Sequence, residues 1–395
     1  MNKLRDIGIS ALAGTLVSLS AAQAGGVSVS GAMELSYTML DHDEVTGNPL
    51  GMKKNISFGG SGDLSDGGGV TWAYGVGMTD AFGLSSATMS INMGGIATLT
   101  YDSGGGGTGA NAVDNITPTA WEEVDYGFAT GISDVGAVSA STGVVTLGIK
   151  APGAGTGFSV SYASRMGGGH QSDGATGTGN EVPGYSGVDV TVDFVDYSAA
   201  HAGFRLGVAA QVELPEMTCK RMKKDQENSN LGDTLASCND GLKHNPYAGT
   251  TFAKLQLGPL HLGTQATFKN LATTASTAIM NTRSIVGGAA LVFGDTLSVS
   301  YGVAYDKFRY NDRTRNTTVL ASESACGDVR HCLHRGKDTY EYVTQKYAGV
   351  SAALNIGPVA LKATRNHVNS HNAGAASGIY KHGDTHSELN LSLAF

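Results

Sequence analysis

The sequence contains no apolar run long enough to cross a membrane as a helix. Its longest apolar stretch, from Ile7 to about Leu19, is shorter than the roughly 20 residues that such a helix needs. Charged residues are also scarce, at 15% of the chain, and the formal net charge of −8 offers no basic excess for binding nucleic acid. If this chain enters a membrane, it must do so as strands.

Proline and cysteine are scarce as well. The chain has 8 prolines and 4 cysteines, against 57 glycines. Low charge with many glycines is typical of many short half-apolar strands, and a large helical enzyme would hold more Leu, Glu, Lys and Arg. A chain with so few prolines leaves room for long strands, because proline is excluded from strand interiors.

The N-terminal residues follow the order of a secretory signal peptide, in which a charged segment precedes an apolar segment and then small residues. Lys3 and Arg5 precede the apolar stretch, and Ala22-Gln23-Ala24 precedes Gly25. We expect cleavage after Ala24, which defines residues 1–24 as the signal peptide and residues 25–395 as a single mature domain. The mature chain keeps 24 basic and 33 acidic residues, a net charge of −9.

Sixteen segments alternate between apolar and polar residues, with the period of two that half-buried strands show. They lie at about 27–37, 54–63, 69–79, 86–93, 96–102, 143–151, 157–165, 187–195, 203–213, 247–257, 260–269, 284–293, 296–306, 341–356, 359–367 and 384–395. All eight prolines fall in the connections or at the first residue of a segment.

The connections alternate between short glycine-rich turns and, with one exception near Asp80, long polar loops. A transmembrane β-barrel shows this arrangement. The last segment ends the chain at Phe395 and carries Leu389, Leu391 and Leu393 on the same face as Phe395. A soluble sandwich or a solenoid adhesin explains the alternating strands equally well, but neither explains the terminal apolar face nor the alternation of connections.

The predicted fold is therefore an all-β transmembrane antiparallel barrel of 16 strands. A barrel of about eight strands is filled by its own side chains, whereas about sixteen strands leave an aqueous channel. The inward residues expected on 296–306 are small or polar, namely Ser298, Ser300, Gly302 and Ala304. These residues would not fill the interior.

The mature chain resembles the bacterial outer-membrane porins, in their 16-stranded trimeric general-diffusion branch. The resemblance rests on the signal peptide, the strand number, the C-terminal L-N-L-S-L-A-F and the long third outer loop. It implies a homotrimer in the outer membrane of a Gram-negative bacterium, with short periplasmic turns, long extracellular loops and the third loop folded into the lumen. It also implies ion transport and passive diffusion of small hydrophilic solutes, contact with outer-membrane lipid and lipopolysaccharide, no enzymatic activity, no cofactor and no nucleic acid partner.

The third loop would span 103–142 and form the constriction. Its acidic residues are Asp114, Glu122, Glu123 and Asp125, and its aromatic residues are Trp121, Tyr126 and Phe128. We expect the aromatic residues to anchor the loop to the inner wall and the carboxylates to line the pore. The alternative is that these carboxylates only solvate an extracellular loop.

The basic residues of the pore wall are assigned by inward parity. They are Lys53, Arg165, Arg205, Lys254, Lys269 and Lys362. Unlike many members of the resembled family, this chain has no close ladder of arginines on the second to fifth segments, which puts a strong transverse field in doubt. An acidic loop and a net charge of −9 predict weak cation selectivity.

The cysteines fall in pairs within two long loops of an exported chain, which favours the disulfides Cys219–Cys238 and Cys326–Cys332. A zinc site at Cys326 and Cys332 with His331 and His334 is the alternative, and we expect no metal. Other functions remain open: a substrate-selective outer-membrane channel, a barrel-anchored surface structural or adhesion protein, or an outer-membrane hydrolase, for which the sequence shows no motif.

Overall fold

The structure is a computed structural model, and it describes most strand residues of the chain. The described residues are 27–41, 48–64, 69–80, 83–103, 107–113, 116–128, 138, 143–150, 156–164, 186–198, 202–214, 245–271, 279–310, 342–371 and 384–395. The predicted signal peptide, Asp114, Arg165 and all four cysteines lie outside these residues. The cleavage site and the two disulfides therefore stay predictions.

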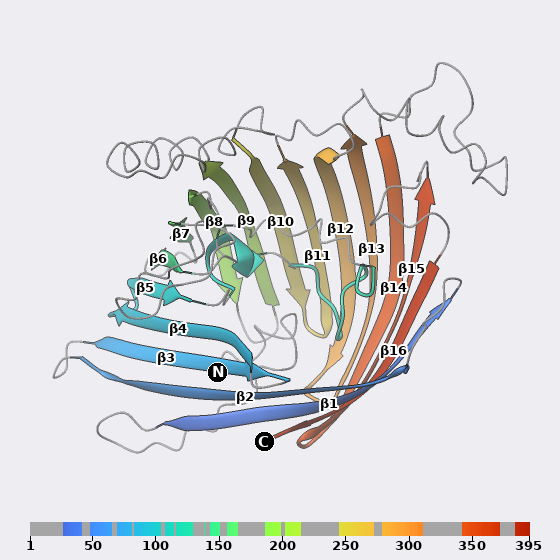
Figure 1. The fold of residues 1–395 in the computed structure, drawn as a ribbon, viewed down its shortest axis with the longest axis horizontal. Coiled ribbons are helices and arrows are strands. Elements are labelled where there is room, and N and C mark those ends of the chain that lie inside the picture. Colours follow the sequence, from blue (N-terminus) through green and yellow to red (C-terminus); the bar gives the residue numbers. More distant parts are fainter. Residues whose placement is uncertain are drawn as a thin grey trace, which may run out of the picture.

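The chain forms a closed barrel of sixteen antiparallel strands (Figure 1), in which each strand pairs with its neighbours in sequence and β1 pairs with β16. The strands are β1 Ser28–Asp41, β2 Leu50–Asp63, β3 Val70–Thr79, β4 Gly83–Met93, β5 Ala97–Asp102, β6 Val144–Lys150, β7 Gly157–Ala163, β8 Ser186–Ser198, β9 Ala202–Leu214, β10 Tyr247–Leu257, β11 Leu260–Asn270, β12 Ile279–Phe293, β13 Leu297–Tyr310, β14 Tyr342–Ile356, β15 Val359–His371 and β16 Asp384–Ala394. One short 3-10 helix, η1, spans Gly109–Val113.

The predicted barrel fold and strand number are confirmed, and each predicted segment overlaps one strand. The largest differences lie where strands meet long connections. β2 begins at Leu50 rather than 54, and β12 begins at Ile279 rather than 284. In both cases the added residues include polar or basic ones, such as Lys53 and Arg283, which interrupt the apolar alternation although their backbone still pairs with a neighbour.

Side chains alternate between the two faces of the barrel wall as the sequence predicts. On β16, Leu391 is 42% exposed and faces outward, whereas its neighbour Asn390 is 2% exposed and faces the interior. The same alternation separates outward Val299 and Tyr301 from inward Ser300 on β13. The outer surface is therefore apolar and the inner wall is lined by small and polar groups.

The two ends of the chain close the barrel. Phe395 N donates to Gly31 O and Gly31 N donates to Phe395 O, each over 3.0 Å. A Cβ atom at Gly31 would lie 2.5 Å from Cζ of the Phe395 ring, so the terminal aromatic ring needs the space that this glycine leaves. The last residue of the sequence thus forms part of the ladder.

Short turns connect the strands at one end of the barrel. Gly258 and Gly357 begin two of them with φ values of 57° and 59°, in the left-handed region that glycine adopts without a steric penalty. Each of these glycines precedes a proline, Pro259 or Pro358, as the sequence analysis expected for connections. Among the described residues, no helix has both the length and the apolar character that crossing a membrane would require.

The outward face of β16 can be tested with spin labels. A label at Leu391 should be accessible to oxygen dissolved in lipid and shielded from a water-soluble nickel complex, because this side chain faces outward. A label at the neighbouring Asn390 should lose the oxygen access. Accessibility of the Leu391 label to the nickel complex, or identical behaviour of the two labels, would contradict this assignment.

Candidate functional site

The connection between β5 and β6 contacts the inner wall of the barrel. Its first described part, η1, packs against β7, β8 and β9. Ala110 and Val113 of η1 form a buried apolar cluster with Ala209 of β9 and Phe252 of β10. From there the chain passes over the inner faces of β11 to β13 (Figure 1). The acidic and aromatic residues of this loop are thus placed beside inward-facing side chains.

A row of four inward-facing glycines receives the loop. Gly263 pairs with Gly288, Gly288 with Gly302, and Gly302 with Gly349, so that the row crosses β11 to β14 in register. A Cβ atom at Gly263 would lie 2.5 Å from Cδ of Pro118, and one at Gly288 would lie 3.0 Å from the Pro118 carbonyl oxygen. We call these four residues the glycine row. At Gly302 a Cβ atom would lie 3.1 Å from Cβ of Val124, so the loop lies this close to β11, β12 and β13 because these three glycines carry no side chain.

Glutamine side chains of the wall hold two parts of the loop by its backbone. The Ile116 amide donates to Oε1 of Gln265 over 3.2 Å, and Nε2 of Gln265 donates to the Val113 carbonyl over 3.2 Å. On β9, Oε1 of Gln211 accepts the Val138 amide over 3.0 Å. Both glutamines are buried, so these bonds satisfy loop backbone groups that water does not reach.

Two serines hold the next residues of the loop. The Ala120 amide donates to Oγ of Ser300 over 2.8 Å, and the Trp121 amide donates to Oγ of Ser351 over 3.2 Å. The two hydroxyls lie 2.7 Å apart and bond to each other. Neighbouring strands thus bind successive loop residues.

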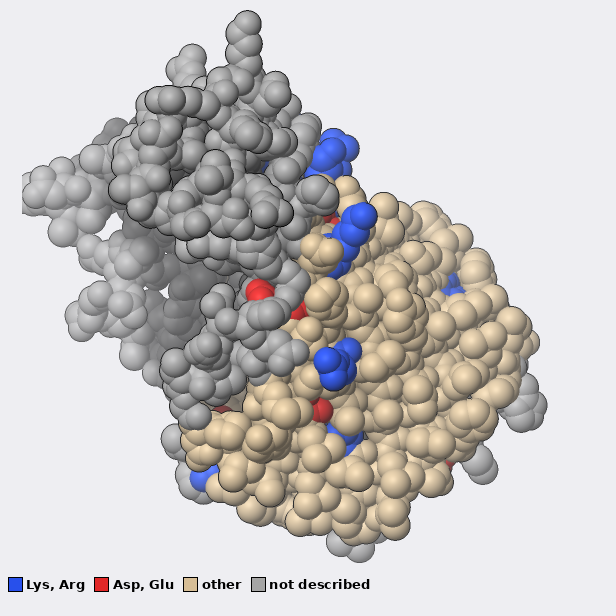
Figure 2. Space-filling view, turned by 90° about the vertical axis from the view of Figure 1, so that its right-hand side faces the viewer, with Lys and Arg blue, Asp and Glu red and all other residues tan. Residues whose placement is uncertain are grey.

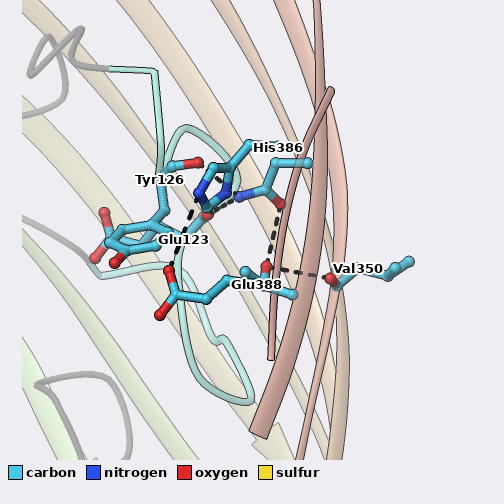
Figure 3. Close-up of polar contacts among 7 residues, drawn as sticks. Glu123, Tyr126, Val350, His386 and Glu388 are labelled. Atoms are coloured by element: carbon cyan, nitrogen blue, oxygen red, sulfur yellow. Dashed lines mark hydrogen bonds and ion pairs between the residues drawn. The ribbon is translucent and has the colours of Figure 1, made fainter. Parts of the chain in front are cut away.

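Asn366 of β15 holds the turn that follows. Its Nδ2 donates to the Glu123 carbonyl over 2.7 Å and to the Tyr126 carbonyl over 3.1 Å (Figure 3). Thr364 Oγ1 donates to Oδ1 of Asn366 over 3.4 Å. A Cβ atom at Gly349 would collide with the Asn366 amide. The last glycine of the row therefore gives this asparagine the space to reach the loop.

The three predicted anchoring aromatics occupy different environments. Phe128 is fully buried, with its ring 6.0 Å from that of Tyr347 and 6.3 Å from that of His386. Trp121 is also buried. Tyr126 is more exposed, and it lies edge-on to His386 with 5.4 Å between the ring centroids. Two of the three rings thus fill space between the loop and the wall.

The Tyr126 hydroxyl stays neutral. Burial is the main cause that raises the pKa of Tyr126, and the carboxylates of Glu388 and Glu122 raise it further. The carboxylate of Glu388 lies 4.0 Å from Nε2 of His386 (Figure 3), the histidine on which the Tyr126 ring packs edge-on. The loop and β16 therefore meet at His386, a contact that the sequence analysis did not predict.

Glu122 lies among carboxylates as well as basic residues. Burial raises its pKa to about 7, Glu388 and Glu34 raise it too, and Lys362 and Lys53 lower it. The acidic residues Glu34 and Glu388 come from β1 and β16, the two strands that close the barrel. The carboxylates of Glu34 and Glu388 thus act on Glu122 together with the basic residues, a combination that the sequence analysis did not predict.

The five expected basic wall residues that the structure describes lie at inward positions but differ in their contacts. Lys362 is only 2% exposed, and its Nζ lies 3.6 Å from Oε1 of Glu34 and 5.8 Å from the centre of the Trp121 ring. Arg205 makes a two-pronged contact with Asp193, over 2.9 and 3.1 Å. Both side chains are therefore engaged with the protein itself. Lys53 is exposed, and Lys254 and Lys269 are half-buried.

Glu123 and Asp125, the other two described acidic residues of the loop, are half-buried.

The residues that hold the loop were not identified from the sequence, although the alternation had placed several of them on the inner face. Gln265, Ser300, Ser351 and Asn366 looked like ordinary inward polar residues. The available signal was the glycine row, because four successive strands carry glycine at inward positions.

The chain is similar to known proteins in its structure. No protein-family model matches the chain, and no curated protein matches it. Similar solved structures include a form of OmpT that lacks loop L8, an outer membrane protein of Vibrio cholerae, with a TM-score of 0.58 and 10% identity over 94% of this chain and 100% of that chain. The anion-selective porin of Comamonas acidovorans has a TM-score of 0.52 and 15% identity over 94% of this chain and 100% of that chain.

OmpF of Salmonella typhi in complex with daunomycin has a TM-score of 0.55 and 11% identity, over 93% of this chain and 97% of that chain. At these identities the likeness establishes the barrel fold alone.

The glycine row yields a prediction with a control on the adjacent residue. Gly288→Val should displace Pro118 from the wall, since the new side chain occupies the place of the loop. We expect amide exchange at Ala120 and Trp121 to accelerate by roughly tenfold or more, from an overpacking cost of about 1–3 kcal/mol. Gly287→Val places the same side chain on the outer face and should leave this exchange unchanged. Equal exchange in both variants would contradict the role of the row.

The titration of Glu122 gives a second prediction. Because its pKa is raised to about 7, the carboxyl group should be protonated below pH 7 and charged above it. Carbon NMR of labelled glutamate should show this midpoint. Glu388→Gln should lower the midpoint, and Lys362→Gln should raise it, since the two residues act on the Glu122 pKa in opposite directions. A midpoint near 4.5 that neither variant moves would show that Glu122 is solvated.

Proposed function

We propose that this protein is an outer-membrane porin that forms a water-filled channel for passive diffusion of small hydrophilic solutes and ions, with a weak preference for cations. The observation that carries the proposal is the loop held against the inner wall of a sixteen-stranded barrel by the glycine row and by Gln265, Ser300, Ser351 and Asn366. Sixteen strands enclose more space than side chains fill, and a loop seated on the wall narrows that space.

The charges around Glu122 favour cations. The carboxylates of Glu388 and Glu34 both raise the pKa of Glu122, and the buried Lys362 is already engaged with Glu34. Carboxylate groups that line a pore attract cations and repel anions. Since the pKa of Glu122 is about 7, the preference for cations should weaken as the pH falls through 7.

The proposal includes the setting of the channel. We infer that residues 1–24 direct export, that the mature chain spans the bacterial outer membrane among lipid and lipopolysaccharide, and that it acts as a homotrimer without a cofactor or enzymatic activity. The apolar outer side chains of β1 and β2, such as Leu35, Met39 and Met52, suit contact between copies. A trimer form is recorded for OmpT of Vibrio cholerae, which is similar in structure.

A substrate-selective channel is the second candidate. The partly exposed ring of Tyr126 beside His386 and Glu388 combines an aromatic surface with polar groups, as binding sites for small molecules do. Block of the ion current that saturates with one solute would favour this candidate. A barrel that serves only as a surface anchor would show no conductance after reconstitution, and a hydrolase would turn over lipid or peptide.

The cation preference can be tested by removing loop charges. In planar bilayers, the variant Glu122→Gln, Glu123→Gln, Asp125→Asn should show a permeability ratio of potassium to chloride reduced roughly twofold at pH 8, since screened carboxylates act only over about 10 Å. The matched control removes Asp63, Asp80 and Asp295, three exposed acidic residues outside the loop, and should keep the wild-type ratio. An unchanged reversal potential in the loop variant would refute the assignment.

A further inference from the structure

Two consecutive serines of β4 face the lumen, although neighbouring residues of a strand normally point to opposite faces. The register between β3 and β4 shifts directly after Gly77, where Gly77 pairs with Ser86 and the following residue pairs with Leu84. Ser85 is the additional residue of this β-bulge. Bulges redirect side chains and are frequent next to active sites, so this part of the inner wall is a candidate for binding a ligand.

Three hydroxyl groups gather around Gly77. A Cβ atom at this glycine would lie 2.8 Å from Oγ of Ser86, 3.0 Å from Oγ of Ser85 and 3.9 Å from Oγ of Ser57 on β2. We call these three serines the serine cluster. Among the residues that the structure describes, none of the three hydroxyls has a hydrogen-bond partner. Each is therefore available to a ligand, and a glycine in a strand lets a ligand approach the backbone closely.

The wall around the serine cluster carries no charge. Few charged side chains are expected on the outer surface, and Figure 2 shows a broad uncharged area there, but an inner wall in contact with water does not require their absence. β3 and β4 nevertheless contain no Asp, Glu, Lys or Arg. On β2 the nearest inward charge is Lys53, four residues before Ser57, or about 13 Å along a strand. A charged solute would lose hydration at the cluster without gaining an opposite charge.

The loop between β5 and β6 approaches this side of the barrel. Lys53 of β2 lowers the pKa of Glu122, so this part of the loop lies near the strand that carries Ser57. The ring of Tyr126, on the same part of the loop, is 38% exposed. A solute that passes between the loop and β2 to β4 therefore has an aromatic ring on one side and hydroxyl groups on the other.

The serine cluster lies close to the end of the barrel that carries the long connections. Ser85 and Ser86 are the third and fourth residues of β4, which begins at Gly83. The connection that leads into β4 from Thr79 is the short exception among those at this end. A solute that enters from this end therefore reaches the cluster without passing beneath a long connection of β3 and β4.

We propose that the serine cluster and the Tyr126 ring form a binding site for an uncharged sugar inside the channel. This inference rests on the proposed function and deepens it by naming a class of solute. A serine hydroxyl both donates and accepts hydrogen bonds, and the hydroxyl groups of a sugar do the same, so the two sets are complementary. The apolar face of a sugar ring suits an aromatic side chain, and sites for small molecules combine aromatic surface with a few convergent polar groups.

The test measures block of the ion current by glucose in planar bilayers. The variant Ser57→Ala, Ser85→Ala, Ser86→Ala removes three hydroxyl groups with little change in size. We expect the block to saturate in the wild type, and the glucose concentration for half-maximal block to rise about tenfold in the variant. A tenfold change is about 1.4 kcal/mol, a modest total for three neutral hydrogen bonds.

Two controls and a second variant accompany the test. The matched control Ser61→Ala, Ser90→Ala, Ser159→Ala removes three other inward hydroxyls and should be blocked like the wild type. Triethylene glycol, an uncharged chain without a ring of hydroxyl groups, measures the effect of size and should block weakly. Tyr126→Leu should weaken the block by glucose, because it removes the aromatic side of the site.

The outcomes separate the sugar site from the proposed channel. Normal conductance without a saturable block by glucose overturns the sugar site and leaves the channel standing, and so does an equal block in the serine variant or by triethylene glycol. Absence of conductance in the wild type refutes the channel. In that case saturation-transfer NMR of glucose with the full-length protein in detergent decides the sugar site, since the serine variant should lose the signal and the matched control should keep it.

Discussion

The interior of this barrel depends on one steric constraint, the absence of side chains along the glycine row. The loop between β5 and β6 can lie on the wall because Gly263, Gly288 and Gly302 offer bare backbone to Pro118 and Val124. Once the loop is in contact, wall side chains bond its amides and carbonyls. These hydrogen bonds depend on the glycines, because hydrogen bonds are short and directional. The buried serines and glutamines reach the loop only when it lies this close to the wall.

The wall also separates charge. A strand sends successive side chains to opposite faces, so a single-residue step converts an inward acid into an outward base, as at Asp306 and Lys307. Inside, the acidic groups of β1, β16 and the loop gather near Lys362. Outside, most exposed side chains are apolar. The inner face is thus suited to water and the outer face to lipid. The same backbone hydrogen bonds between strands hold the side chains of both faces in place.

Much of the fold was predictable because it follows from a period of two. Alternation gave all sixteen strands, and proline and glycine marked the connections. The differences arose at strand ends such as Ile279, where polar residues continue the ladder without apolar partners.

The site was less predictable than the fold. Asn366 and Ser300 bind backbone groups of the loop. Every residue has such groups, so the sequence does not show which of them a side chain will bind. Glu34 and Glu388 lie near opposite ends of the chain and both raise the pKa of Glu122, which only the closure of β1 on β16 brings about.

That closure has a consequence for biogenesis. Because β16 pairs with β1, and Phe395 extends this pairing to Gly31, the seam cannot form until the C-terminal strand is in place. Until then both terminal strands present unpaired edges, which are prone to pair with other chains. A polypeptide whose β16 is not yet paired with β1 would therefore need an escort that shields both edges.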